Sequence, residues 1–346
     1  MLKSRLCIAF FAFAVGCAPA QKPLTDYVNP MLGTATLWDS VDLGFKPTKR
    51  TWGAEVFPGS SLPNAMVQVS PVTKFHSGAG YQYEDSVIYG FTHTNKGHWN
   101  LCHIPLLPVT GTPTPGDYCS PFSHERESAA PGYYQVFLDR YGVDAQLSST
   151  LRCAFHKYTY PAGAAPAVLA DLQRSNEHVR AWDIRKEGDN VFAGWQQTGE
   201  KMYFYAVANR PVTGIEPVVE GDREVRIVRF GEGDGALELR IGFSFVSEKN
   251  ARENLEAEML GKSFAEVRSE ATATWNDLLG RIRVEGGTER EKGLFYSSLY
   301  RSFLWPALRS DVNGEFTDVD GKVINPGFRY YTGPSYWDDY RNKLIL

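Results

Sequence analysis

A side-chain period of two between residues 24 and 246 constrains the fold of this chain more than any other feature. Short runs there alternate apolar or aromatic residues with polar ones, and Gly, Pro, Asn and Asp separate the runs, as at 133–138, 201–207, 225–230 and 237–243. Successive side chains of a strand point to opposite faces, so this alternation predicts strands with one buried face. Many short strands without a long helix predict a mainly β chain, with a β-sandwich domain over residues 21–247.

The period lengthens after Val246, where apolar residues recur every three to five positions. This spacing predicts amphipathic helices over 248–260 and 263–281. Ser263 with Glu266, and Thr288 with Glu291, have the form of capping boxes, and Pro306 ends the helix that Thr288 opens. We therefore predict a helical linker over 248–308 and the start of another domain over 309–346. The apolar run at 342–346 has no cap, and we expect it to be an element cut in mid-course.

The first 20 residues have the form of a bacterial signal peptide. Lys3 and Arg5 precede an apolar run over 6–16. Two cleavage sites compete: residues 14–17 resemble a lipobox, which would leave Cys17 lipidated, and residues 18–20 form an A-x-A site, which would release a soluble protein. Both alternatives predict an exported protein, in the periplasm or at the cell surface, that meets a membrane only through a lipid anchor.

Charge and motifs exclude several classes of function. The chain has 36 Lys and Arg against 40 Asp and Glu, a net charge of -4, so it lacks the basic field that nucleic-acid binding requires. It contains no P-loop, Rossmann fingerprint, G-x-S-x-G elbow or H-E-x-x-H motif. Cys102, Cys119 and Cys153 follow the signal peptide, which allows one disulfide and leaves its pairing open.

A polar and aromatic run over residues 90–103 holds three of the seven histidines, His93, His98 and His103. These are zinc-ligand types, but their spacing matches no established zinc motif. Two further interpretations stay open. The histidines are satisfied within a strand and loop, or the run contacts a substrate, with His93 and His98 hydrogen bonding to sugar hydroxyls and Trp99 offering a stacking face.

Two acidic segments near the end of the chain also allow alternatives. Trp337 and Asp338 begin a predicted last helix, where they either shape a sugar site or complement the helix dipole. Residues 311–322 carry oxygen ligands at alternate positions, as calcium prefers. The EF-hand spacing requires Gly where Phe316 stands, so Asx–Gly turns are the preferred interpretation there.

Ordered segments over nearly the whole chain together resemble glycoside hydrolase family 92, the calcium-dependent exo-α-mannosidases. The resemblance rests on residues 27–34 (YVNPMLGT), 57–59 (FPG), 63–71 (PNAMVQVSP), 80–81 (GY), 90–94 (GFTHT), 295–300 (FYSSLY), 330–331 (YY) and 337–338 (WD). It implies an N-terminal β-sandwich, a helical linker and the start of an (α/α)6 barrel, truncated in this chain.

The activity implied by the resemblance is calcium-dependent hydrolysis, with inversion, of terminal α-mannosides of glycans. Inversion needs two carboxyl groups about 6.5–9.5 Å apart. Family members are considerably longer, so we expect the catalytic acid, the base and the Ca²⁺ ligands beyond residue 346, and no metal site within this chain.

The resemblance carries sugar binding over to Trp337 and Asp338 and to the sandwich loop with His93, His98 and Trp99. At residues 93–98 that loop departs from the family's usual H-T-H-L-S-G. Because the loop borders the leaving-group side of the site, we expect the preference for linkage or leaving group to differ. The expected partner is a mannose-containing glycan. The alternatives are a carbohydrate-binding module without catalysis and an inactive gene fragment.

Overall fold

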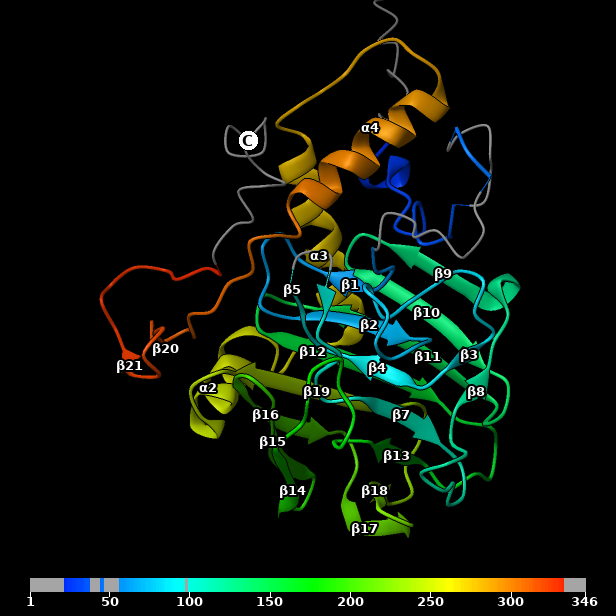
Figure 1. Ribbon diagram of the computed structural model, residues 1–346, viewed down its shortest axis with the longest axis vertical. Coiled ribbons are helices and arrows are strands. Elements are labelled where there is room, and N and C mark those ends of the chain that lie inside the picture. The colour runs from blue at the N-terminus through cyan, green and yellow to red at the C-terminus, as the bar shows by residue number, and fades with distance from the viewer. Residues whose placement is uncertain (1–21, 38–43, 47–55, 97–98, 333–346) are drawn as a thin grey trace, which may run out of the picture.

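The computed structural model describes residues 22–37, 44–46, 56–96 and 99–332. Two antiparallel sheets pack face to face and form the body of the protein, which confirms the predicted mainly β sandwich (Figure 1). The first sheet has the strand order β1 (Ser60–Ser61), β2 (Gln68–Val72), β4 (Gly90–Thr92), β7 (Leu106–Val109), β13 (Ala167–Ala170), β18 (Arg223–Phe230) and β17 (Val212–Glu220).

The second sheet is the larger of the two. Its order is β14 (Ala181–Gly188), β15 (Val191–Gln197), β16 (Lys201–Ala208), β19 (Leu237–Ser244), β12 (Cys153–Thr159), β11 (Val143–Ser149), β10 (Tyr133–Leu138) and β9 (Glu127–Ala130). Short pairs are formed by β3 (Val87–Ile88) with β8 (Ser120–Pro121), β5 (Asn95–Lys96) with β6 (Trp99–Asn100), and β20 (Phe316–Thr317) with β21 (Val323–Ile324).

The sequence alternation corresponds to burial between the sheets. In β16, Met202 and Phe204 are buried in the sandwich core while Lys201 and Tyr203 face outward, half-buried. The edge strand β17 is mostly exposed and carries Pro217, a residue that edge strands tolerate because it removes a ladder donor. The alternation thus sets both the core and the outward face.

The helices follow the strands and begin at caps visible in the sequence. They are α2 (Glu248–Glu258), α3 (Phe264–Leu279) and α4 (Glu289–Ser302), together with the 3-10 turns η1 (Leu24–Tyr27) and η2 (His124–Arg126). Both predicted capping boxes are present, at Ser263 with Glu266 and at Thr288 with Glu291. The predicted last helix over 336–346 lies outside the described residues.

Two smaller cores attach these helices to the sandwich. The helix α2 lies on the outer face of the second sheet, where Gly242 allows the close approach: a Cβ at this position would stand 2.1 Å from the carbonyl oxygen of Ala251. The helices α3 and α4 pack with η1 at one end of the sandwich around the fully buried Trp275 (Figure 1). The Nε1 of Trp275 donates a hydrogen bond to the Ser61 carbonyl oxygen at 2.8 Å.

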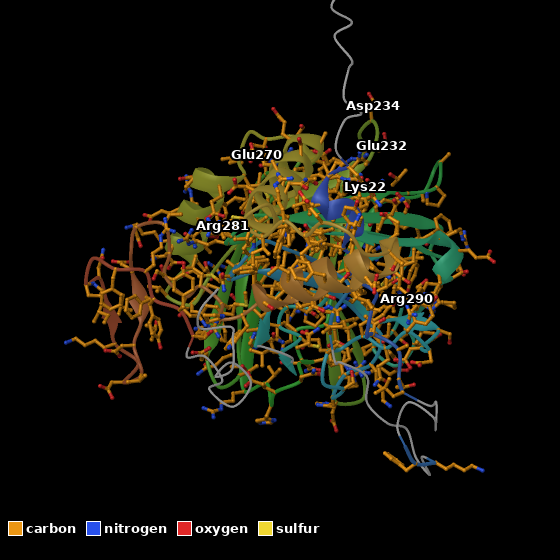
Figure 2. All side chains as sticks on the ribbon, turned by 90° about the horizontal axis from the view of Figure 1, so that it is seen from above. Lys22, Glu232, Asp234, Glu270, Arg281 and Arg290 are labelled. Carbon is orange, nitrogen blue, oxygen red and sulfur yellow. The ribbon has the colours of Figure 1, made fainter. Side chains whose placement is uncertain are left out.

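The three cysteines that follow the predicted signal peptide, Cys102, Cys119 and Cys153, are free thiols, and Cys102 and Cys153 are buried. None of the helices in the described ranges is long and apolar enough to cross a membrane. Seen from above, side chains of both charge signs project around the molecule, as the labelled Glu270, Arg281 and Arg290 illustrate (Figure 2). This mixture agrees with the small net charge of -4.

Candidate functional site

A cluster of charged and polar side chains forms where four segments distant in sequence meet beside the second sheet. We call it the polar cluster, and it consists of His103, Glu177, Thr198, Glu200 and Arg309. His103 closes the histidine-rich run, Thr198 and Glu200 lie in the turn between β15 and β16, and Arg309 follows α4. The sheet hairpin fixes the turn, and the other segments converge on it.

His103 is buried at the base of the polar cluster, and hydrogen bonds at both ring nitrogens orient its ring. The Thr198 hydroxyl donates to Glu177 Oε2 at 2.6 Å, so it accepts from His103 Nε2 at 2.9 Å. The Thr94 hydroxyl lies 2.8 Å from the other ring nitrogen, Nδ1, and donates to it when the ring is neutral. A chain of hydrogen bonds therefore runs from the sandwich interior to Glu177, whose side chain is 40% exposed.

Arg309 supplies the positive charge of the polar cluster. Its guanidinium lies 3.8 Å from the ring centroid of Phe245 and 3.1 Å from Glu200 Oε2. Burial lowers the pKa of Arg309, and the charges of Glu200, Tyr330 and Glu177 oppose that shift. A guanidinium held on an aromatic face beside two carboxylates offers donors and acceptors that match sugar hydroxyls.

A second network holds the segment that carries Arg309 against the sandwich. The buried Asp311 carboxylate accepts hydrogen bonds from Ser244 at 2.6 Å and from the side-chain amides of Asn250 at 2.9 Å and Asn254 at 2.6 Å. Burial raises the pKa of Asp311, and its three donors act in the opposite direction. Because the donors come from β19 and α2, this carboxylate fixes the register of the segment on both elements.

His93, predicted to contact substrate, lies in the interior of the sandwich. It is 0% exposed, its Nε2 lies 3.0 Å from His156 Nε2, and its ring packs against Phe243. The buried ring has no exposed surface in this chain, so we interpret it as support for the loop rather than as a direct contact. The other interpretation, in which the histidines form their hydrogen bonds within the fold, describes His93 better.

His98, Trp337, Asp338 and the lipidation candidate Cys17 lie outside the described residues, and only the backbone of Trp99, at the start of β6, is described. Thr332 is the last described residue, and it stands five positions before Trp337. Thr332 is buried and hydrogen bonds with the backbone of Ala307.

The described residues do not fit a calcium site. They contain no group of three His, Cys, Asp or Glu side chains arranged to hold a metal ion. In the acidic segment over 311–322, Asp318 Oδ1 accepts from the backbone N–H groups of Asp320 and Lys322, and Asp311 is occupied as described above. The preferred interpretation of this segment as Asx–Gly turns is confirmed.

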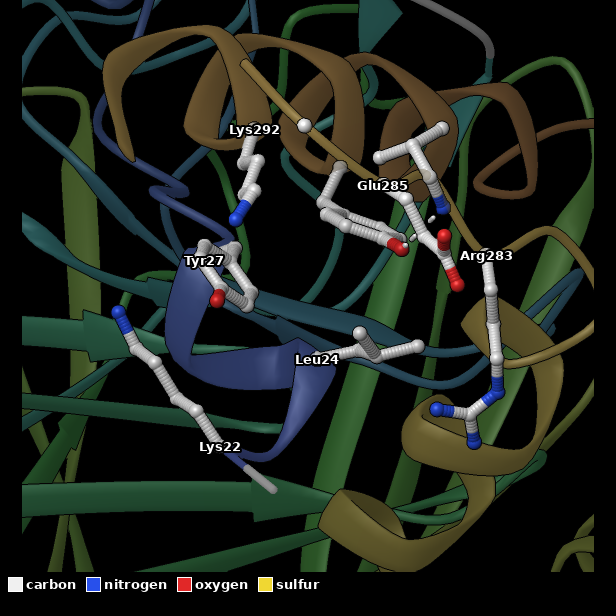
Figure 3. A pocket seen from close by; sticks show the side chains of 9 residues that line it. Lys22, Leu24, Tyr27, Arg283, Glu285 and Lys292 are labelled. Atoms are coloured by element: carbon white, nitrogen blue, oxygen red, sulfur yellow. Dashed lines mark hydrogen bonds between the residues drawn. The ribbon is translucent and has the colours of Figure 1, made fainter. Parts of the chain in front are cut away.

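A separate cavity of about 280 Å³ lies between η1, the segment over 283–286 and α4 (Figure 3). Lys22 lies 4.1 Å from the ring centroid of Tyr27 and 3.3 Å from Glu289, which also pairs with Lys292 at 3.7 Å. These contacts join η1 to α4, and we place the candidate site at the polar cluster instead, because it brings together charged groups of four segments distant in sequence.

Sequence reasoning did not single out Glu177, Thr198, Glu200 or Arg309. Residues 198–200 form a short polar turn between two strands, which is the ordinary appearance of a hairpin. Arg309 stands 109 positions after Glu200. The pairing of these residues depends on the tertiary fold, and only the polar turn gave a local signal.

Comparison with known proteins gives matches along almost the entire chain. The model of the glycosyl hydrolase family 92 N-terminal domain matches residues 27–254, and that of the family 92 catalytic domain matches residues 250–346. A protein of Arthroderma benhamiae described as an uncharacterized secreted glycosidase is 25% identical over 344 residues, which are 84% of this chain and 42% of that protein.

Solved structures agree with the family models. The family GH92 α-mannosidase BT3965 of Bacteroides thetaiotaomicron has a TM-score of 0.82 and 26% identity, over 93% of this chain and 46% of that one. The inverting mannosidase BT2199 of the same species has a TM-score of 0.78 and 25% identity, over 94% of this chain and 46% of that one. The chain thus spans less than half the length of these relatives. Since a family model covers well over half of its residues, the chain belongs to glycoside hydrolase family 92.

Proposed function

We propose that this chain supplies the β-sandwich and part of the sugar site of an inverting exo-α-mannosidase that acts on terminal α-mannosides of glycans. The polar cluster is the observation that carries the proposal. It gathers carboxylate, guanidinium and hydroxyl groups at the junction between the sandwich and the segment leading to Trp337 and Asp338. The solved structures similar to this chain include a mannosidase in complex with mannoimidazole, at 26% identity.

In this proposal, Glu177 and Arg309 hold sugar hydroxyls. The Thr198 hydroxyl and His103 orient the Glu177 carboxylate through one of its oxygens, which reduces the rotational freedom it would lose on binding. Arg309 is positioned by Phe245 and Glu200 before a ligand arrives. The donors and acceptors of the site are therefore ordered in advance of sugar binding.

We assign no catalytic acid or base to this chain. Inversion needs two carboxyl groups about 6.5–9.5 Å apart with water between one of them and the sugar. We propose that these groups and the Ca²⁺ ligands lie in the part of the relatives' length that this sequence does not span. Calcium would there bind sugar hydroxyls, and none of the roles given to Glu177 or Arg309 depends on it.

We also propose that the protein is exported. The positively charged start, the apolar run over 6–16 and the small residues before Cys17 and Gln21 support export. The Arthroderma relative is described as secreted. Labelling with radioactive palmitate, with Cys17→Ser as control, separates the lipoprotein from the released form.

Titration calorimetry with methyl α-mannoside tests the sugar site on the 346-residue chain. We expect Glu177→Gln to weaken binding by about tenfold, because it replaces a charge-assisted hydrogen bond worth roughly 1.5–3 kcal/mol. Glu187→Gln is the matched control, on the edge strand β14 away from the polar cluster. Equal affinities for the two variants, or no binding by the wild type, would contradict the site.

Hydrolysis of an aryl α-mannoside tests the activity. We expect the 346-residue chain to give no turnover with added calcium, and the native protein that contains this sequence to release the β-anomer of mannose first by proton NMR. Turnover by the 346-residue chain that EDTA abolishes would overturn our placement of the catalytic groups. Mannoside binding without hydrolysis by the native protein would favour the alternative of a carbohydrate-binding module.

A further inference from the structure

A groove of about 730 Å³ runs along the outer face of the second sheet, next to the polar cluster. Its floor includes Gln197 and Tyr203, and its opposite side includes Asp318, Val319 and Tyr330. In Figure 1 the hairpin of β20 and β21 stands beside α2 at one side of the sandwich. The groove therefore lies between the sheet and a segment that follows β16 by more than 100 residues.

Tyr203 is the aromatic residue of the sheet that lines this groove. It pairs across the ladder with Trp195, and Lys201 Nζ lies over both rings, 3.5 Å from the Trp195 centroid and 5.0 Å from the Tyr203 centroid. Two positions further along the same face, Tyr205 packs against the core beneath α2 and α3, with Arg252 at 5.7 Å from its centroid. The three aromatic side chains share one face, but only Tyr203 lines the groove.

The charges that line the groove balance. Glu200 and Asp318 are acidic, and Lys201 and Arg309 are basic. Arg309 pairs with Glu200 at 3.1 Å, and the Asp318 carboxylate accepts backbone N–H groups of its own turn. A phosphate or a polyanion would meet no surplus of positive charge here, so the lining favours a neutral ligand.

The remaining lining combines aromatic faces with neutral hydrogen-bonding groups. Tyr203, Phe245 and Tyr330 supply the aromatic surface, and Gln197 and Thr317 supply amide and hydroxyl groups. A pyranose ring has an apolar face and a rim of hydroxyls, and this combination satisfies both. The volume lies within the range of sites that enclose small ligands.

We propose that this groove binds a neutral oligosaccharide, namely the part of the glycan that extends from the terminal mannose, with Tyr203 as the stacking surface. The inference rests on the proposed function, because the same glycan has to reach the polar cluster. Glu200 and Arg309 belong to both the polar cluster and the groove lining, so a short run of sugars passes from one to the other. The groove thus favours extended glycans over single mannosides.

Calorimetry with methyl α-mannoside and with α-linked mannotetraose tests the proposal on the 346-residue chain. We expect the tetraose to bind about tenfold more tightly than the monosaccharide, and Tyr203→Ala to remove that difference, as truncation of an aromatic anchor does. Tyr203→Phe keeps the stacking face and should keep the affinity. Tyr205→Ala is the matched control and should bind both ligands as the wild type does, and urea unfolding verifies that each variant is folded.

The outcomes separate the groove from the proposed function. Equal affinity for both ligands, equal effects of Tyr203→Ala and Tyr205→Ala, or no binding of the tetraose would overturn the groove. Tetraose binding that depends on Tyr203 without any binding of methyl α-mannoside would support the groove and contradict the sugar site at the polar cluster. Mannoside binding that depends on Glu177, with no gain for the tetraose, would do the reverse.

Discussion

We expect the buried histidine pair, His93 and His156, to make the sandwich sensitive to acid. His93 and His156 are both 0% exposed, their Nε2 atoms lie 3.0 Å apart, and His156 Nδ1 lies 2.5 Å from the Tyr158 hydroxyl. Burial lowers the pKa of His93 to about 3, while contacts with the backbone of His103 and Ile104 partly oppose the shift. Burial and the neighbouring His93 also hold the pKa of His156 well below its usual value.

The sign and size of the effect follow from these shifts. In the unfolded chain both rings titrate near 6.5, so between that pH and the lower folded pKa the unfolded state binds more protons than the folded state. The stability that neutral burial allows is present above pH 6.5 and is lost as the pH falls. Each unit below 6.5 costs about 1.4 kcal/mol for His93, so a change from pH 7.5 to 5.0 costs about 2 kcal/mol there, and His156 adds a loss of the same sign.

Urea unfolding followed by tryptophan fluorescence at pH 7.5 and 5.0 measures this loss. We expect the free energy of unfolding of the wild type to fall by more than about 2 kcal/mol, and that of His93→Gln to fall by about 2 kcal/mol less than the wild type. The exposed His178 offers a control, since His178→Gln should keep the wild-type loss. The reasoning is refuted if His93→Gln and the wild type lose the same stability on acidification.

Three further substitutions test the packing by urea unfolding at pH 7.5. Asp311→Ala removes the acceptor of three hydrogen bonds and should cost about 3 kcal/mol, and a loss below 1 kcal/mol would contradict its anchoring role. Trp275→Phe leaves a void and an unpaired Ser61 carbonyl, which should cost about 3 kcal/mol, whereas an unchanged midpoint would show that the second core repacks. Gly132→Ala places a Cβ 2.5 Å from the Ala271 methyl of α3 and should cost about 2 kcal/mol more than Gly163→Ala. Gly163 is the control because it has the same φ of 77° and open space around it, and equal losses would rule out the clash.

The strands and helix starts were predictable because their determinants are local. The β16 alternation of Met202 and Phe204 with outward residues fixes which face meets the core, and any register shift would bury Lys201. The capping boxes at Ser263 and Thr288 need only residues three positions apart. Because such features depend on residues within one element, they can be predicted from the sequence.

The polar cluster was not predictable for the opposite reason. Its ion pair joins Glu200 and Arg309, and its hydrogen bonds join His103 to Thr198 across 95 positions. The histidine-rich run drew the prediction to His93, which differs from His103 by ten positions and occupies the sandwich core instead. Residue type indicated the right loop, while the depth of each ring depends on how that loop packs on the second sheet.

Tyr203 and Tyr205 have the same local sequence pattern but different surroundings, which the pattern does not predict. Both occupy outward positions of β16, and both are half-buried tyrosines flanked by buried residues. The helix α2 lies across the outer face of the sheet near Tyr205, because Gly242 on β19 lets its backbone approach, whereas Tyr203 lies beyond α2 and lines the groove opposite the β20–β21 hairpin. A strand's alternation thus decides which side chains leave the core, and the elements that later cover the sheet decide which of them can meet a ligand.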